Sequence, residues 1–156
     1  MSKLVIIYDS KTGYTETMAN SIAKGAKLVE NITVFLKKIS ESTSYNALED
    51  ANLIAIGSPS HHGHVTPEML VFLFNLQEVI AAGKLNLKGK LGFAFGSYGW
   101  DGGICIEKLH AEMRNLGLDM NQKAFAKVTP IPDSSSKAEF VNDCQVVGKN
   151  LANKIC

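Results

Sequence analysis

The sequence LVIIYDSKTGYT, at residues 4–15, is the strongest indication of the fold, because five consecutive apolar residues lead directly into a polar stretch that contains one glycine. A strand that is apolar at every position, rather than at alternate positions, is typical of a parallel sheet covered on both faces. Two further runs of this kind lie at 53–57 and 91–96, and each also ends in small or polar residues. These segments predict the central strands of a parallel sheet.

Lysine residues dilute two weaker apolar segments, at 32–39 and 123–131, which we therefore expect to form edge strands. Apolar residues at helical spacing fill the gaps between the strands. The predicted helices cover 15–28, the region from Pro67 to Leu76 with Leu70 in its apolar stripe, 104–116, a short turn near 47–51, and the tail from Ser135. Five strands that alternate with helices predict right-handed crossovers and a single α/β domain over residues 1–156. We expect a three-layer, doubly wound sandwich with a five-stranded parallel sheet of order 2-1-3-4-5.

The composition excludes several classes of protein. The 16 Lys and Arg residues nearly balance the 15 Asp and Glu residues, so nucleic-acid binding has no electrostatic support. The apolar stretches are far shorter than the ~20 residues that cross a bilayer, so we expect no membrane insertion. The 3 cysteines are widely spaced and favour reduced thiols in a cytoplasmic protein, with a Cys105–Cys144 disulfide as the alternative.

The loops after the first, third and fourth strands are the expected binding site, because ligands of such sheets bind where the strand order reverses. In the first loop, hydroxyls of Ser10, Thr12 and Thr15 surround Gly13 at the start of a helix. Helix N-terminal N–H groups favour a phosphate, and glycine lets the backbone approach it closely. The alternative is a plain capped turn. Neither a Walker A motif nor a GxGxxG fingerprint is present.

The first loop, the segment 57–60 and the sequence FGSYGWDGG at 95–103 together resemble a short-chain flavodoxin. In motif they are most similar to the flavodoxin-like domain of flavodiiron proteins. The resemblance implies a flavodoxin-like fold and bound FMN. It implies that the 5′-phosphate is held by Ser10, Lys11, Thr12, Gly13, Tyr14 and Thr15. It implies one wall of the isoalloxazine site from Ser58, Pro59, Ser60, His61, His62 and Gly63, and the other from Ser97, Tyr98, Gly99, Trp100, Asp101, Gly102 and Gly103.

Two features of these walls concern the flavin itself. In the family that the chain resembles, a glycine peptide near flavin N5 rearranges on reduction, and Gly63 occupies the matching place. A carbonyl turned toward the N5–H would stabilise the semiquinone. We expect Tyr98 and Trp100 to contact the flavin, the alternative being loop aromatics folded onto the protein surface.

The most unusual motif is the set of histidines His61, His62 and His64. A metal site is one interpretation, but three ligands so close in sequence rarely reach one ion. The other is that one or two histidines line the flavin, which would make its reduction potential pH-dependent between about pH 6 and 7. For Cys105, near a helix start, the alternatives are a lowered thiol pKa and a buried small apolar residue.

These observations favour an electron carrier that shuttles electrons through the semiquinone and hydroquinone of FMN. Its partners would be redox proteins contacted transiently, and a monomer would suffice. The alternative is an NAD(P)H-dependent quinone or flavin reductase on the same fold. A cofactor-free interaction module would leave the hydroxyl-rich first loop unexplained. Flavodoxins are commonly acidic, whereas this chain has a net charge of +1, so steering by net charge should be weak.

Overall fold

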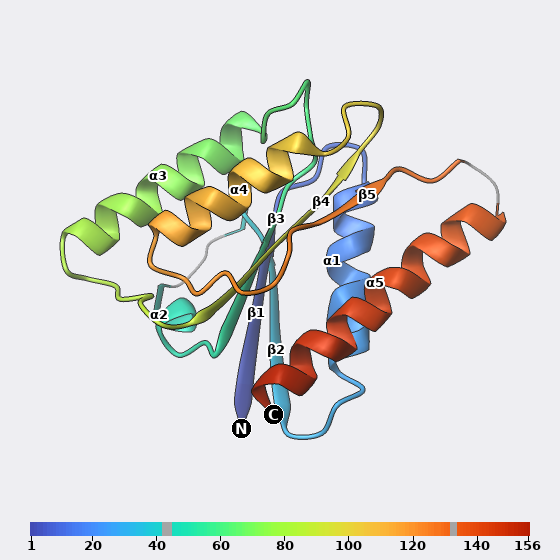
Figure 1. Ribbon diagram of the computed structural model, residues 1–156. Coiled ribbons are helices and arrows are strands. Elements are labelled where there is room, and N and C mark those ends of the chain that lie inside the picture. Colours follow the sequence, from blue (N-terminus) through green and yellow to red (C-terminus); the bar gives the residue numbers. More distant parts are fainter. Residues whose placement is uncertain (42–44, 132–133) are drawn as a thin grey trace.

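The computed structural model describes residues 1–41, 45–131 and 134–156, and over these residues strands and helices alternate along the chain (Figure 1). The strands are β1 (Ser2–Tyr8), β2 (Ile32–Lys38), β3 (Leu53–Gly57), β4 (Leu91–Tyr98) and β5 (Phe125–Val128). The helices are α1 (Tyr14–Ala26), α2 (Tyr45–Glu49), α3 (Pro67–Ala81), α4 (Ile104–Asn115) and α5 (Ser134–Ile155).

The strands form one parallel sheet in the order β2-β1-β3-β4-β5, which confirms the predicted topology. The central strands β1, β3 and β4 are almost wholly buried, whereas β2 and β5 at the edges are partly exposed. The last strand is shorter than the expected 123–131. One reason is Pro130, which has no N–H group to donate to a neighbouring strand.

Helices cover both faces of the sheet: α1 and α5 lie on one face, and α3 and α4 lie on the other (Figure 1). Alternate residues of β1 point to opposite faces, so Leu4 and Ile6 pack with α1 and α5, whereas Val5 and Ile7 pack with α3 and α4. Because both faces of the strand are buried from Leu4 to Tyr8, each of these five positions is apolar. This explains the run of apolar residues that predicted the fold.

The helices α1 and α5 approach each other through two glycines. A Cβ atom at Gly25 would lie 1.9 Å from the Gln145 carbonyl oxygen, and one at Gly148 would lie 1.9 Å from the Ile22 carbonyl oxygen. Only glycine permits backbones to come this close. The two residues therefore fix the position of α1, whose N-terminus follows the first loop.

The predicted helices are confirmed with small changes at their ends, but the apolar stripe of α3 is narrower than expected. Met69, Leu73 and Leu76 are buried, whereas Leu70 is 53% exposed because it lies beside a groove between α3 and α4. Within the described ranges, no helix is long and apolar enough to cross a membrane.

The cysteines are all free, so the Cys105–Cys144 disulfide is not formed. Cys105 packs in the core beneath α3 and α4, whereas Cys144 packs in the core beneath α1 and α5. The sheet lies between the two thiols, which excludes a bond between them in this fold.

Candidate functional site

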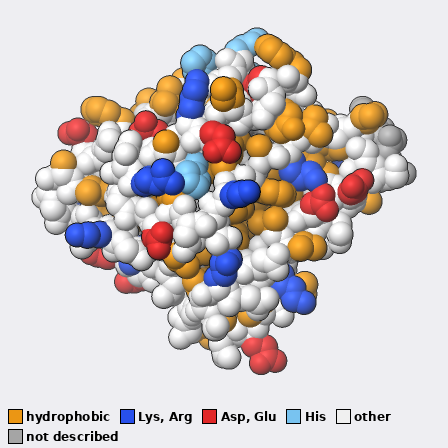
Figure 2. All heavy atoms as spheres, in the orientation of Figure 1, with side chains coloured by type: hydrophobic (Ala, Val, Ile, Leu, Met, Phe, Trp, Pro, Cys, Tyr) orange, Lys and Arg blue, Asp and Glu red, His pale blue; other side chains and the backbone are white. Residues whose placement is uncertain are grey.

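The loops after β1, β3 and β4 meet at the carboxyl end of the sheet, at the top of Figure 1. Figure 2 shows histidine side chains at the same edge of the molecule. A cleft of about 280 Å³ opens between these loops. Its lining residues are Lys11, Thr12, Pro59, Ser60, His61, His62, Ser97, Tyr98, Gly99, Trp100, Asp101 and Thr129.

The first loop presents unpaired backbone donors. Gly13 has a φ of +96°, in the left-handed region, and it caps the start of α1. The Ser10 hydroxyl oxygen accepts hydrogen bonds from the N–H groups of Gly13 and Glu16, each at 3.2 Å. Within the described part of the chain, no protein acceptor pairs with the N–H groups of Lys11, Thr12, Tyr14 and Thr15. Such donors at a helix start suit an anion.

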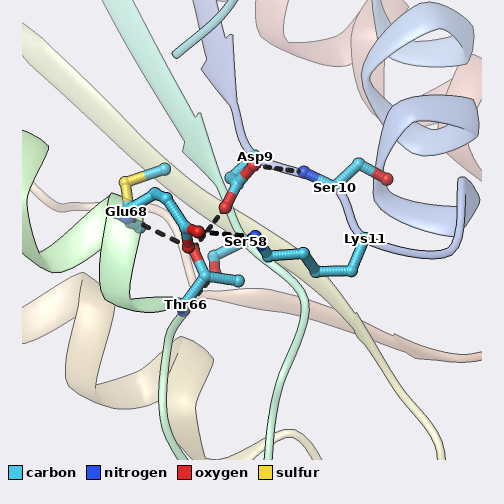
Figure 3. Close-up of polar contacts among 7 residues, drawn as sticks. Asp9, Ser10, Lys11, Ser58, Thr66 and Glu68 are labelled. Atoms are coloured by element: carbon cyan, nitrogen blue, oxygen red, sulfur yellow. Dashed lines mark hydrogen bonds and ion pairs between the residues drawn. The ribbon is translucent and has the colours of Figure 1, made fainter. Parts of the chain in front are cut away.

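Behind the first loop, a buried carboxylate ties β1 to the start of α3 (Figure 3). Asp9 is 4% exposed, and its carboxylate accepts hydrogen bonds from the Ser10 N–H group at 2.9 Å and from the Thr66 hydroxyl. The same Thr66 oxygen caps α3 by accepting from the Met69 N–H group at 3.2 Å. The Thr66 N–H group in turn donates to the Ser58 hydroxyl at 3.4 Å. The network therefore fixes the loop after β3 relative to the first loop.

An ion pair also joins these elements, because Lys11 Nζ lies 2.8 Å from Glu68 Oε1 (Figure 3). The hydrogen bond to Glu68 raises the pKa of Lys11, and the same bond lowers the pKa of Glu68. Both side chains are exposed, so water and salt screen the pair. Lys11 also lines the cleft, which leaves its charge available to a ligand there.

One wall of the cleft, the loop after β3, contains a tight turn. His61 and His64 exchange backbone hydrogen bonds of 2.8 and 2.9 Å, and the φ angles between them are +51° at His62 and +80° at Gly63. Positive φ at both central residues is characteristic of a type I′ turn. His61 and His62 line the cleft, but His64 lines the separate groove between α3 and α4. His64 therefore lies apart from His61 and His62, and the described residues contain no group of three or more His, Cys, Asp or Glu residues that could hold a metal ion.

The opposite wall, formed by the end of β4 and the loop after it, contains the aromatic residues. Trp100 is 82% exposed at the rim, and its ring lies edge-on to that of His62 with 6.2 Å between ring centres. Asp101 lies next to it and accepts hydrogen bonds from both walls. Burial by itself would raise the pKa of Asp101, but hydrogen bonds from Ser60, Gly103 and Gly63 bring it below the ordinary value.

The structure places the expected site residues in two groups. Eleven line the cleft, and Thr129, which was not expected, joins them. Thr129 directly follows β5 and donates its N–H group to the Tyr98 carbonyl at 2.8 Å, so the predicted topology could have revealed it. The expected residues that do not line the cleft are Ser10, Gly13, Tyr14, Thr15, Ser58, Gly63, Gly102 and Gly103.

Other residues that support the site could not be recognised from the sequence. Asp9, Thr66 and Glu68 act through contacts between distant segments. For Cys105, burial raises the thiol pKa, so the alternative of a lowered pKa at the helix start is wrong. Cys105 is fully buried beside Pro59 and acts as a small apolar residue.

A family model described as flavodoxin matches residues 6–138. The chain belongs to the flavodoxin family. A flavodoxin from Aquifex aeolicus is 38% identical over 166 aligned residues, covering 97% of this chain and 86% of that relative. The solved structure of a flavodoxin from the domain Archaea has a TM-score of 0.81 at 27% identity and covers 98% of each chain.

The flavodiiron protein from Giardia intestinalis also shares the fold of this flavodoxin family member. Its TM-score is 0.81 at 21% identity, and the match covers 99% of this chain but only 36% of that chain. The expected resemblance to flavodoxins and to flavodiiron proteins is thereby confirmed.

Membership of the flavodoxin family implies a flavin cofactor, typically FMN, and a role in electron transport. The residues present fit such a group. The unpaired N–H groups of the first loop suit a phosphate, and the neighbouring cleft has aromatic and imidazole side chains for a flat ring.

Proposed function

We propose that this chain is an FMN-binding electron carrier. The observation that carries the proposal is the position of the unpaired N–H groups of the first loop, which lie at the same end of the sheet as a cleft lined by Tyr98 and Trp100. A ligand with both a phosphate and an aromatic ring system satisfies both parts of the site. FMN is such a ligand, and it is the typical cofactor of the family.

Each part of the site has a role in this proposal. The backbone of residues 10–15 binds the phosphate, with the hydroxyls of Ser10 and Thr12 and the ammonium group of Lys11 close by. The loops 58–63 and 97–103 orient the ring and shield its faces from water. When bound, FMN supplies one-electron and two-electron transfer, and the protein tunes that chemistry through the groups placed around the ring.

The exposed rim of the cleft supports a carrier. Trp100, His61 and His62 are all exposed there, so a partner protein can reach the cleft edge without any rearrangement of the chain. We propose brief contacts with redox partner proteins, a monomeric state, and a cytoplasmic location in keeping with the free thiols. A net charge of +1 means that local contacts, more than long-range steering, select the partner.

Two measurements test the function. First, the dissociation constants of FMN and riboflavin for the apoprotein are compared by flavin fluorescence. A bound phosphate predicts that FMN binds much more tightly, whereas equal affinities would contradict the role of the first loop. Second, the FMN-loaded protein is photoreduced without oxygen and then mixed with NADPH or NADH and a quinone. Accumulation of a one-electron-reduced flavin without nucleotide oxidation supports the carrier, and quinone-dependent turnover would instead identify a reductase.

A further inference from the structure

The carboxylate of Asp101 joins the two walls of the cleft, although these walls come from different parts of the chain. Its Oδ2 atom accepts hydrogen bonds from the Ser60 hydroxyl at 2.7 Å and from the Gly63 N–H group at 3.1 Å. Its Oδ1 atom accepts from the Gly103 N–H group at 2.9 Å. One side chain therefore bonds to both the loop after β3 and the loop after β4.

The loop that Asp101 restrains needs such support. His62 is a residue with a side chain in the left-handed region, where its φ of +51° is unfavourable. Gly63, the next residue, donates its N–H group to Asp101, which fixes the plane of the peptide that joins His62 to Gly63. The orientation of this peptide thus depends on a residue of the opposite wall.

The hydrogen-bond pattern favours an ionised carboxylate. All of the groups that face Asp101 donate, including two backbone N–H groups that cannot reverse their direction. An amide at this position would turn its own NH₂ group toward one of these donors, and an alanine would leave them without an acceptor. Both substitutions should leave the sheet and the helices intact, because the Asp101 side chain lies at the cleft and outside the cores.

We propose that Asp101 is a positioning residue that holds the loops 58–63 and 97–103 at a fixed separation and so shapes the cleft for a planar ring. This inference rests on the proposed function, because it takes the cleft as the site of the FMN ring. Asp101 therefore affects binding of the isoalloxazine ring of FMN. The phosphate half is bound by the first loop, to which no Asp101 hydrogen bond leads.

The test compares Asp101→Asn, Asp101→Ala and Ser60→Ala with a charge-matched control, Asp119→Asn. Asp119 is exposed and its backbone pairs with β4 at Leu91, at the opposite end of the sheet from the cleft. Ser60→Ala removes one of the bonds to Asp101, so its effects should be smaller and in the same direction.

The first readout is amide hydrogen exchange at Gly63, measured by NMR on the apoprotein and therefore independent of any flavin. Exchange should become faster by at least about tenfold in Asp101→Asn and Asp101→Ala, because a charge-assisted hydrogen bond is lost. It should be unchanged in Asp119→Asn. Equal exchange rates in the wild type and both Asp101 variants would overturn the proposal.

The second readout is flavin binding. The affinities for FMN and for riboflavin should fall by the same factor, about tenfold, because only the ring site changes. A loss confined to FMN would overturn the proposal, since it would place the effect at the phosphate. Failure of the wild type to bind either flavin would instead contradict the proposed function.

The third readout separates positioning from general stability. The reduction potential of bound FMN should become less negative in Asp101→Asn, because a negative charge no longer opposes charge on the reduced ring. Asp119→Asn should leave the potential unchanged. If both variants shift it equally, the role of Asp101 at the ring is wrong.

Discussion

The hydroxyl oxygen of Thr15 lies 2.8 Å from that of Ser97, and both side chains are almost completely buried. Thr15 belongs to the first turn of α1, and Ser97 lies near the end of β4. This hydrogen bond connects the proposed phosphate loop to a wall of the cleft from inside the protein. The two halves of the site are thus held together below their surfaces.

Replacement of Thr15 by valine should destabilise the protein. Thr15→Val conserves the shape of the side chain but leaves the buried Ser97 hydroxyl without its partner, so the free energy of unfolding should fall by about 1–3 kcal/mol. Urea unfolding of the apoprotein measures the change. Thr15→Ser keeps the hydroxyl and serves as the control. A Thr15→Val protein as stable as the wild type would show that the bond is unimportant.

Removal of the charge on Glu68 should strengthen FMN binding. Glu68→Gln releases Lys11, whose ammonium group lines the cleft, so that more of its charge acts on the phosphate. Because the pair is exposed, the gain should be at most about fivefold in the dissociation constant. Riboflavin, which has no phosphate, should bind equally to both proteins. A gain that persists unchanged in 1 M salt would contradict an electrostatic origin.

Alanine should be tolerated better at Gly63 than at Gly103. Both residues have positive φ, so each substitution introduces backbone strain of about 1–2 kcal/mol. At Gly63 the new Cβ meets only the Ile104 side chain at 3.5 Å, whereas at Gly103 it lies 2.8 Å from Ala126 and Tyr98. Thermal unfolding should therefore show the larger loss for Gly103→Ala. The reverse order would mean that the turn at Gly63 is under tighter constraint than its surroundings indicate.

The cysteines should differ sharply in reactivity. Cys156 is exposed, whereas Cys105 and Cys144 are fully buried. Burial raises the pKa of Cys105 and that of Cys144, the latter to about 12, which disfavours the reactive thiolate at both positions. A thiol reagent should quickly modify one cysteine in the native protein and all 3 in denaturant. Rapid modification of a Cys156→Ser variant would show that the core opens.

The sequence predicts the centre of the fold well because the physical cause is local. Every position of β3 is buried, as are residues 4–8 of β1, and a continuous apolar run in the sequence results from that burial. The ends of the edge strands are harder to predict from the sequence. The strand β5 ends shortly before Pro130, and its length also depends on its pairing with β4. Periodicity places Leu70 in the apolar stripe of α3, although its side chain is exposed. The spacing of apolar residues shows which face of a helix is apolar but not how much of that face is buried.

The loops of the site were predicted from topology, whereas the bonds between them were not. The switch in strand order selects the loops after β1, β3 and β4 without knowledge of any side chain. The contacts of Asp9 with Thr66 and of Asp101 with Gly63 join residues far apart in sequence. A single sequence contains no pattern that pairs such residues, so only the three-dimensional structure reveals them.

The glycine contacts between α1 and α5 have a consequence for the order of assembly. Gly25 meets Gln145, and Gly148 meets Ile22, so each contact spans most of the chain. Bringing such distant segments together closes a very long loop, and non-local contacts of this kind slow folding. The packing of α1 against α5 therefore forms only when the two ends of the chain meet. Packing of the α1–α5 layer should be a late step in folding, with a rate limited by how often the two distant segments meet.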